Sequence, residues 1–293
     1  MHKAGFVNIV GNPNVGKSTL MNQLVGEKLS IATFKAQTTR HRIMGIVNTE
    51  DSQIVFSDTP GVLKPNYKMQ EMMLQFSESA LADADILLYV TDVIEDPEKN
   101  MDFLEKVAKM SIPVILLINK IDESDQKKLG DLVTKWHRLL PNAEILPISA
   151  KNKFGTDILL KRVHELLPES PAFFDKDQLT DKPAKFFVSE IIREKILRYY
   201  DKEIPYSVEV VVESFKEDDR QIHINAVIYV ERNSQKGIII GHQGMALKKV
   251  STEARKSLER FFDKKIFLET FVKVDKDWRN SQKELKHFGY NPE

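Results

Sequence analysis

Residues 11–18 read GNPNVGKS, and this octapeptide decides the fold of the first half of the chain. It follows the apolar run GFVNIV and precedes a stretch with helical periodicity, the context that a phosphate-binding loop requires. Gly11 and Gly16 let the backbone curl so that successive N–H groups face an anion, while Lys17 reaches the terminal phosphates. We predict a nucleoside triphosphate here, with the Ser18 hydroxyl on Mg²⁺. The predicted contacts are Gly11, Asn12, Pro13, Asn14, Val15, Gly16, Lys17, Ser18 and Thr19.

Outward from this loop, short apolar runs alternate with helix-length amphipathic stretches. The runs are GFVNIV, RIMGIV, SQIVFS, ADILLYVTD, IPVILLIN and AEILPIS. Several are almost unbroken Val, Ile and Leu, which is typical of strands buried on both faces of a parallel sheet. The intervening helices are expected near 17–26, 69–82, 98–110, 127–139 and 154–167. The pattern predicts an α/β domain over residues 1–168, Ras-like, with a mostly parallel sheet.

The tetrapeptide DTPG, residues 58–61, follows the run SQIVFS and supplies the expected second phosphate contact. Asp58, at the end of that strand, can hold Mg²⁺ through water, and the Gly61 N–H can contact the γ-phosphate. Thr59 and Pro60 complete this part of the predicted nucleotide site.

Between these two loops lies KAQTTRHR, which contains Thr38 and Thr39. A mobile segment here is expected to supply a threonine whose hydroxyl completes the Mg²⁺ shell only when the γ-phosphate is present. Both threonines are candidates, and we favour Thr39. The predicted metal ligands are then Ser18, Thr39 and Asp58, and the predicted catalytic residues are Asn14, Lys17, Thr39 and Gly61.

Two further segments predict that the base is guanine. NKID, residues 119–122, ends the strand PVILLIN, and SAK follows the next run. A carboxylate at Asp122 accepts both N–H groups of the guanine edge, whereas adenine would leave it desolvated and unpaired. The Ala150 N–H is placed to bond the guanine O6. The predicted contacts in these segments are Asn119, Lys120, Asp122, Ser149, Ala150 and Lys151.

The composition limits the other classes of function. Lys plus Arg equals Asp plus Glu at 43 each, so net charge favours no polyanion, and any such site must come from local clustering. The chain has no cysteine, which removes disulfides, thiolate metal sites and a cysteine nucleophile. We recognise neither a signal peptide nor an uncharged apolar run of the ~20 residues that span a bilayer. We expect a soluble cytoplasmic protein.

The second half follows a different pattern. Three prolines and several acidic residues interrupt the periodicity in LLPESPAFFDKDQLTDKP, so we take 169–184 as a linker and 185–293 as a second domain with a C-terminal tail. The predicted order of elements is helix (VSEIIREKILRYY), strand (SVEVVVESF), strand (QIHINAVIYV), glycine turn, helix and strand (KIFLETFVKV). A final helix is expected in DWRNSQKELKHFGY. On the last strand, core packing is favoured over base stacking for Phe267 and Phe271.

The glycine turn is GHQG, residues 241–244, between the apolar run GIII and a helix with several basic residues. Such a short pattern also fits a structural turn beside a solvated basic face. Glycines would let a nucleic-acid backbone come close, because a side chain would fend off the phosphates. On the helix, Lys249, Lys256 and Arg260 share one stripe, with Lys248 and Arg255 beside it.

NPNVGKS, KAQTTRHR and DTPG together resemble the Era family of bacterial ribosome-assembly GTPases. The resemblance continues in IIREKI, IIIGHQG and the closing DWR and FGY, so it covers essentially the whole chain. It implies a P-loop GTPase domain followed by an α+β KH domain of type II, in which a Gly-x-x-Gly turn joins two helices and clamps about four nucleotides. The implied RNA contacts are Gly241, His242, Gln243, Gly244, Lys248, Lys249, Arg255 and Lys256.

The same resemblance implies a GTP-hydrolysing switch that binds small-subunit (16S) ribosomal RNA near its 3′ end and assists maturation of the 30S subunit. It also implies a monomer, and peripheral association with the inner face of the cell membrane is a candidate property. Two alternatives stay open. One is an RNA-binding assembly module whose GTPase is incidental, and the other is a GTPase that signals through a protein partner docked on the C-terminal domain.

The usual water-orienting residue is missing at position 62. Many GTPases place a glutamine just after the DTPG glycine to orient the attacking water, but the side chain of Val62 can neither donate nor accept a hydrogen bond. We therefore expect slow intrinsic turnover. In several related GTPases an asparagine at the position of Asn14 helps to hold K⁺ near the β- and γ-phosphates, which makes K⁺ a candidate cofactor beside GTP, GDP and Mg²⁺.

Overall fold

The computed structural model describes residues 2–291, which form two compact units. Unit 1 contains the chain up to Asn66 and Gln70–Asp181, and unit 2 contains Tyr67–Met69 and Lys182–Asn291. The main division, after Asp181, falls inside the segment 169–184. Between residues 2 and 291, none of the helices has both the length and the apolar character that a bilayer-spanning helix needs.

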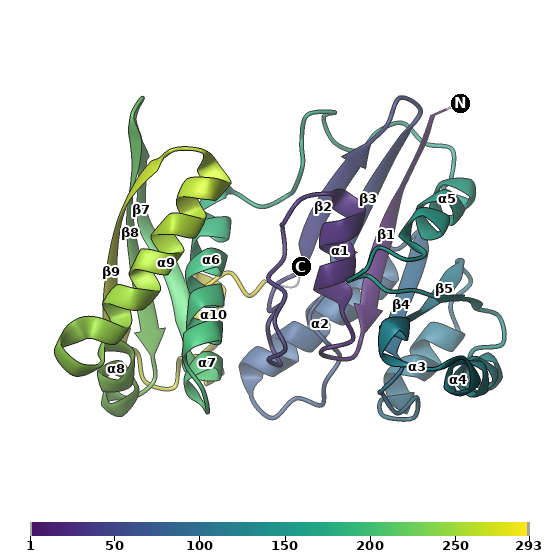
Figure 1. Cartoon of the computed structure of the whole chain (residues 1–293), viewed down its shortest axis with the longest axis horizontal. Coiled ribbons are helices and arrows are strands. Elements are labelled where there is room, and N and C mark those ends of the chain that lie inside the picture. Colours follow the sequence, from purple (N-terminus) through teal and green to yellow (C-terminus); the bar gives the residue numbers. More distant parts are fainter. Residues whose placement is uncertain (1, 292–293) are drawn as a thin grey trace. The chain divides into compact units, whose positions relative to one another are not determined.

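Unit 1 is built on a six-stranded sheet with the order β2-β3-β1-β4-β5-β6 (Figure 1). Neighbouring strands are parallel except β2, which runs antiparallel to β3. All residues of β3 and β4 are buried, so both faces at the centre of the sheet are covered, as the unbroken apolar runs predict. The strands are β1 (Lys3–Gly11), β2 (Ile43–Asn48), β3 (Ser52–Asp58), β4 (Ile86–Asp92), β5 (Val114–Asn119) and β6 (Glu144–Pro147).

Helices cover this sheet on two sides. Helix α1 contacts β1, β2, β3 and α5, whereas α2, α3 and α4 share a core with β4 and β5 that includes Ala80, Phe103 and Trp136. The predicted α/β alternation is confirmed, and its helices are found within a few residues of the expected places. The helices are α1 (Lys17–Val25), α2 (Lys68–Ala82), α3 (Met101–Ala108), α4 (Gln126–Leu139) and α5 (Thr156–Leu166), with a 3₁₀ turn η1 (Ile121–Glu123) after β5.

The chain that follows α5 stays attached to unit 1. Thr180 forms an antiparallel bridge with Gly45 of β2. The Gln53 Oε1 accepts the N–H groups of Phe173 and Phe174 at 2.7 and 3.0 Å. Much of the segment expected to be a linker therefore runs along the edge of the sheet.

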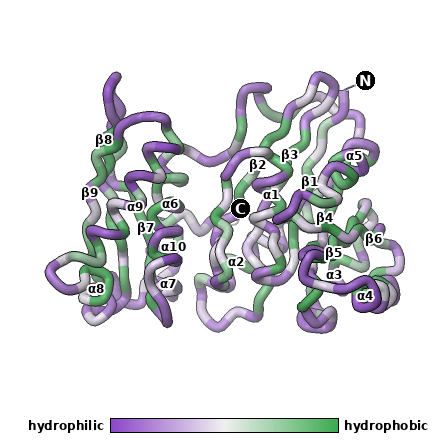
Figure 2. The backbone as a smooth tube through the Cα atoms, viewed as in Figure 1, coloured by the Kyte–Doolittle hydropathy of each residue, from purple (hydrophilic) through white to green (hydrophobic). Residues whose placement is uncertain are grey.

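Unit 2 has a three-stranded sheet with the order β7-β8-β9, in which β7 and β8 are antiparallel and β8 and β9 are parallel. Its core joins one face of the sheet to α6, α8 and α9 through residues such as Ile192, Ile239 and Leu258. Hydrophobic residues gather along the strands in Figure 2. The elements are α6 (Ala184–Tyr199), α7 (Ile204–Ser207), β7 (Glu209–Glu217), β8 (Gln221–Val230), α8 (Asn233–Ile240), η2 (His242–Gly244), α9 (Met245–Phe262), β9 (Lys265–Val274), η3 (Trp278–Asn280) and α10 (Gln282–His287).

Helix α8 was missing from the predicted order of elements, and the run GIII forms its last turn. A short apolar run fits a strand or a buried helix equally well by periodicity alone. The start of α8 also lacks a Ser, Thr or Asp cap. Instead, the Gln235 Oε1 accepts the N–H groups of Glu231 and Arg232 at 3.0 and 3.1 Å.

The expectation of core packing for Phe267 and Phe271 was wrong. The two side chains are 51% and 50% exposed, and they alternate with the buried Ile266 and Val272 of β9. They therefore point to the face of the sheet opposite the helices.

A buried polar contact connects the C-terminal segment to β7. The Tyr290 hydroxyl donates to Glu209 Oε2 at 2.7 Å, and both residues are buried. We expect Tyr290→Phe to lower the free energy of unfolding of unit 2 by about 1–3 kcal/mol, because the buried carboxylate loses a donor.

The change in stability can be measured for unit 2 separately from unit 1. The chain has two tryptophans, Trp136 in unit 1 and Trp278 in unit 2, so Trp278 fluorescence in a Trp136→Phe background reports urea unfolding of unit 2. Tyr206→Phe, in the same unit, is the matched control. Equal unfolding midpoints for the two variants would contradict the prediction.

Candidate functional site

The loop between β1 and α1 follows a path that requires glycine at both ends. Gly11 has a φ of 145°, and a Cβ there would lie 2.1 Å from the carbonyl oxygen of Val90. Gly16 has a φ of 98°, and a Cβ there would lie 2.3 Å from Asn119 Nδ2. The two glycines of the phosphate-binding pattern are thus fixed by backbone geometry and by close neighbours.

Lys17 is buried beneath this loop. Its Nζ donates to the carbonyl oxygens of Gly11 and Asn12 at 3.0 and 2.7 Å. Burial lowers the pKa of Lys17 to about 8, although the charges of Asp58 and Glu95 act in the opposite direction. A phosphate oxygen beside the ammonium would favour its charged form and would itself be stabilised by it.

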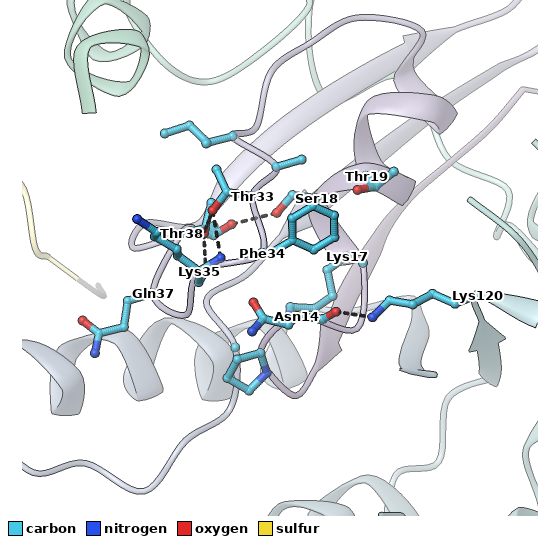
Figure 3. Close-up of a pocket in the computed structure, with 16 residues that line it drawn as sticks. Asn14, Lys17, Ser18, Thr19, Thr33, Phe34, Lys35, Gln37, Thr38 and Lys120 are labelled. Carbon is cyan, nitrogen blue, oxygen red and sulfur yellow. Dashed lines mark hydrogen bonds between the residues drawn. The ribbon is translucent and has the colours of Figure 1, made fainter. Parts of the chain in front are cut away.

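A cavity of about 170 Å³ lies over the loop (Figure 3). Its wall consists of residues of the phosphate loop, residues 31–35 and 37–39, Gly61 and Lys120. Asn14 and Lys120 are joined at one side, where Lys120 Nζ donates to the Asn14 carbonyl oxygen at 2.7 Å. Residues of the phosphate loop, of the segment KAQTTRHR and of DTPG, the last through Gly61, thus meet at one opening.

Three oxygen-bearing side chains converge at the predicted metal position. Ser18 Oγ lies 2.8 Å from Thr39 Oγ1 and donates to Asp58 Oδ2 at 2.7 Å, and Thr39 Oγ1 lies 3.3 Å from the same carboxylate oxygen. Asp58 Oδ1 is buried without a hydrogen-bond partner in the described chain. Burial raises the pKa of Asp58. Two hydroxyls and a carboxylate with one oxygen that accepts no hydrogen bond from the described residues fit Mg²⁺, which prefers oxygen ligands and keeps several waters.

The structure also separates the two threonine candidates. The Thr38 hydroxyl bonds Thr33 Oγ1 and donates to the Lys35 carbonyl oxygen, so it closes a small loop over residues 33–38 (Figure 3). Thr39 alone of the two faces Ser18 and Asp58. This geometry favours Thr39 as the predicted ligand.

The base-recognition segments are braced by side chains. Asn119 Nδ2 donates to the Val15 carbonyl oxygen at 2.8 Å, which ties the NKID segment to the phosphate loop. Ser149 Oγ donates to Asp122 Oδ1 at 2.6 Å and so orients the carboxylate. Asp122 is exposed, so its second oxygen can accept from a base. Lys120 Nζ is also fixed by Asp92 Oδ2 at 2.6 Å.

The Ala150 N–H is already used within the protein. It donates to Asn119 Oδ1 at 2.9 Å. Its assignment to the guanine O6 therefore stays a prediction, as does the contact of the exposed Lys151 beside it.

Sequence reasoning missed two polar side chains that hold the DTPG segment. Ser77 of α2 donates to the Pro60 carbonyl oxygen at 2.8 Å, and Asn100, before α3, donates to the Val62 carbonyl oxygen at 3.2 Å. A serine inside a helix and an asparagine at a helix start have ordinary local explanations. No pattern along the chain distinguishes them.

The predicted RNA-contacting turn has an unusual backbone. Gly241, Gln243 and Gly244 have φ values of 70°, 50° and 76°. A Cβ on Gly241 would lie 2.6 Å from the Cβ of Ala246, whereas one on Gly244 would meet nothing within 4 Å. The turn joins α8 to α9 and presents the exposed side chains of His242 and Gln243.

The basic residues of α9 are partly engaged within the unit. Arg255 pairs with Glu259 at 2.6 Å, Lys256 pairs with Glu253 at 2.9 Å, and Lys249 Nζ lies 4.5 Å above the Tyr199 ring. Exposed pairs of this kind contribute at most about 1 kcal/mol. A phosphate can therefore compete for these cations at small cost.

These two units define a class of protein, a P-loop GTPase domain joined to a KH domain. The family profile described as 50S ribosome-binding GTPase matches residues 6–120, and the profile described as KH domain matches residues 203–279. Among characterised relatives, GTPase Era of Clostridium kluyveri is 44% identical over 99% of this chain and 100% of its own length. GTPase Era of Geobacter sp. strain M21 is 46% identical over 98% of both chains. The chain belongs to the Era family of GTPases.

Two solved structures are similar over nearly the full length. Era in complex with MgGDPNP and nucleotides 1506–1542 of 16S ribosomal RNA is 37% identical, with a TM-score of 0.95 and 99% of both chains covered. A single-substitution variant of Aquifex aeolicus Era bound to GDP·AlF4⁻ is 37% identical, with a TM-score of 0.94 and coverage of 98% of this chain and 99% of the other. The fold predicted from sequence is confirmed.

The Asp122 carboxylate gives a direct test of base recognition. We expect Asp122→Asn to weaken GTP and GDP binding by about 10³–10⁴-fold, because the amide cannot accept both guanine N–H groups. The same variant should bind xanthine nucleotides more tightly. Xanthine presents a carbonyl where guanine presents its amino group, and the side-chain amide introduced at position 122 can donate to this carbonyl. Competition of XDP and GDP for a fluorescent nucleotide measures both effects.

Asp125→Asn is a suitable control. Asp125 lies three residues after Asp122 and caps α4, where its side chain accepts the Lys128 N–H at 2.9 Å. Unchanged preference for guanine in Asp122→Asn would show that another group reads the base.

Proposed function

We propose that this chain is a GTP-driven switch that binds small-subunit ribosomal RNA near its 3′ end through unit 2 and assists maturation of the 30S subunit. The main support is its similarity to the structure of Era with MgGDPNP and nucleotides 1506–1542 of 16S ribosomal RNA, which extends over both units. The glycine turn and the exposed lysines of α9 supply the chemistry that an RNA backbone requires.

In the proposed reaction, the protein's own groups hold the triphosphate and offset its charge. Lys17 and the N–H groups of the phosphate loop face the β- and γ-phosphates, and the Gly61 N–H faces the γ-phosphate. Ser18, Thr39 and Asp58 would hold Mg²⁺, which would supply positive charge to neutralise the negative charge of the triphosphate. Val62 is 4% exposed and points into the core, so it does not orient water. Intrinsic hydrolysis is accordingly slow.

In this proposal, three segments of the chain have different functions. Residues 1–168 form the GTPase domain, 169–184 the linker and 185–293 the RNA-binding domain with its tail. The protein acts as a cytoplasmic monomer on the 30S subunit, with peripheral association with the inner face of the cell membrane as a secondary property. GTP changes RNA affinity only if the two nucleotide states expose the RNA surface differently.

RNA binding can be tested at Gly244, where the backbone is left-handed but the space around a Cβ is open. Asparagine and aspartate tolerate this conformation almost equally, so Gly244→Asn and Gly244→Asp differ mainly by one negative charge. With a short single strand matching the 3′ end of the small-subunit RNA, we expect Gly244→Asp to bind on the order of tenfold more weakly than Gly244→Asn. Fluorescence anisotropy measures this, with GDP and with a non-hydrolysable GTP analogue.

Gly130→Asp adds the same charge at an exposed position of α4 and serves as the control. Tighter wild-type binding with the analogue than with GDP is expected. Equal binding in the two states would refute the coupling but keep the RNA site. No binding in either state would favour a protein partner for unit 2.

We also propose that Asn14 helps to hold K⁺ near the phosphates. Asn14 has a left-handed φ of 67°, its side chain is exposed at the cavity wall, and its carbonyl oxygen is occupied by Lys120. Replacement of K⁺ by Na⁺ at constant ionic strength should slow hydrolysis about tenfold or more. Asn14→Ala should be slow in both salts, and Asn142→Ala should behave as wild type. Equal rates of phosphate release in K⁺ and Na⁺ would exclude this role.

A further inference from the structure

The peptide between Pro60 and Gly61 is held from one side by α2. Ser77 Oγ donates to the Pro60 carbonyl oxygen at 2.8 Å, and Ser77 is fully buried. In a trans peptide the C=O and the following N–H point in opposite directions, and none of the described peptides is cis. The Ser77 hydroxyl therefore fixes the plane that carries the Gly61 N–H and directs this N–H away from α2.

The opposite side of this peptide is open to a ligand. Gly61 lines the nucleotide cavity, and within residues 2–291 its N–H has no hydrogen-bond acceptor. The next N–H, of Val62, is occupied by the Gly11 carbonyl oxygen at 3.1 Å. A Cβ on Gly61 would lie 2.7 Å from Pro13, so the backbone is already close to the phosphate loop.

A second side chain holds the following peptide. Asn100 Nδ2 donates to the Val62 carbonyl oxygen at 3.2 Å and to Asn12 Oδ1. Although Asn100 is the N-cap residue of α3, its side chain makes no capping bond to that helix. The residues after Gly61 are thereby connected to the phosphate loop by side chains rather than by the backbone alone.

We propose that Ser77 is a positioning residue for GTP, because it orients the Gly61 amide toward the γ-phosphate, with Asn100 as its support on the next peptide. The inference rests on the proposed nucleotide switch. GDP has no γ-phosphate, so the orientation of this amide affects GTP and not GDP. Ser77 thus raises the affinity for GTP relative to GDP and the rate of hydrolysis without touching the nucleotide.

A purely structural role for Ser77 predicts something different. A serine in a helix commonly bonds the carbonyl four residues earlier, and here Met73 O lies 3.5 Å from Ser77 Oγ. The shorter bond, to Pro60, lies outside the helix. If the hydroxyl only stabilised α2, its removal would lower the melting temperature and weaken both nucleotides equally.

The test compares Ser77→Ala with Ser79→Ala. Ser79 lies on the same helix and also donates its hydroxyl to a backbone carbonyl, that of Phe76 at 3.0 Å, but it does not contact the DTPG segment. With Mg²⁺ present, the dissociation constants of GDP and of a non-hydrolysable GTP analogue are measured for the full chain, together with single-turnover hydrolysis. Ser77→Ala should bind the analogue about tenfold more weakly with GDP affinity unchanged, and its hydrolysis should slow similarly.

Ser77→Thr, which keeps the hydroxyl, should restore the wild-type ratio of affinities. Asn100→Asp, which removes the donor to Val62, should shift the ratio in the same direction and keeps the inference testable if Ser77→Ala does not fold. A ratio in Ser77→Ala and Asn100→Asp equal to that of Ser79→Ala would overturn the inference. Failure of the wild type to bind either guanine nucleotide would instead overturn the proposed function.

Discussion

Three loops that must act on one nucleotide are bridged by one buried amide, that of Asn119. Its Nδ2 donates to Val15 in the phosphate loop and its Oδ1 accepts from Ala150. Asn119 is 3% exposed, and Gly16 lies so close that a side chain on Gly16 would displace the Asn119 amide. Because both partners are buried, loss of Asn119 would leave a donor and an acceptor unsatisfied at the same point. These hydrogen bonds connect the three loops, and precise placement of phosphate and base depends on them.

The chemistry of unit 1 was predictable because it is local. Parallel strands end at the same edge of the sheet, so the loops after β1, β3, β5 and β6 had to meet, and each carries its own residue pattern. The contacts that orient those loops were not predictable. Ser77 meets Pro60 across 17 residues and Asn100 meets Val62 across 38, and neither separation leaves a periodic trace in the sequence. Helix α8 was missed for a similar reason, since its cap comes from Gln235 inside the helix rather than from a residue before it.

In the proposed RNA contact of unit 2, shape contributes more than charge. The chain as a whole is neutral, and Arg255 and Lys256 each face a glutamate on their own helix. An RNA phosphate that binds either residue exchanges one ion pair for another, so the electrostatic gain is smaller than for an unpaired cation. The turn 241–244 has positive φ values at Gly241, Gln243 and Gly244, and a side chain at Gly241 would collide with Ala246. In the proposed contact, this turn recognises a nucleic-acid backbone by its fit and not only by its negative charge.

Val62 occupies the position where many GTPases have a catalytic glutamine, and its side chain is buried. A residue that orients water must face the nucleotide, whereas Val62 packs beside Ala80 and Phe103 in the core. The same burial anchors the chain just beyond Gly61, so the amide can be held by Ser77 without a bound partner. The Val62 side chain therefore anchors the loop that would contact the γ-phosphate. It does not take part in the attack of water on that phosphate. In the proposed switch, GTP is recognised through these fixed groups, and the absence of a water-orienting side chain at position 62 prolongs the GTP-bound state.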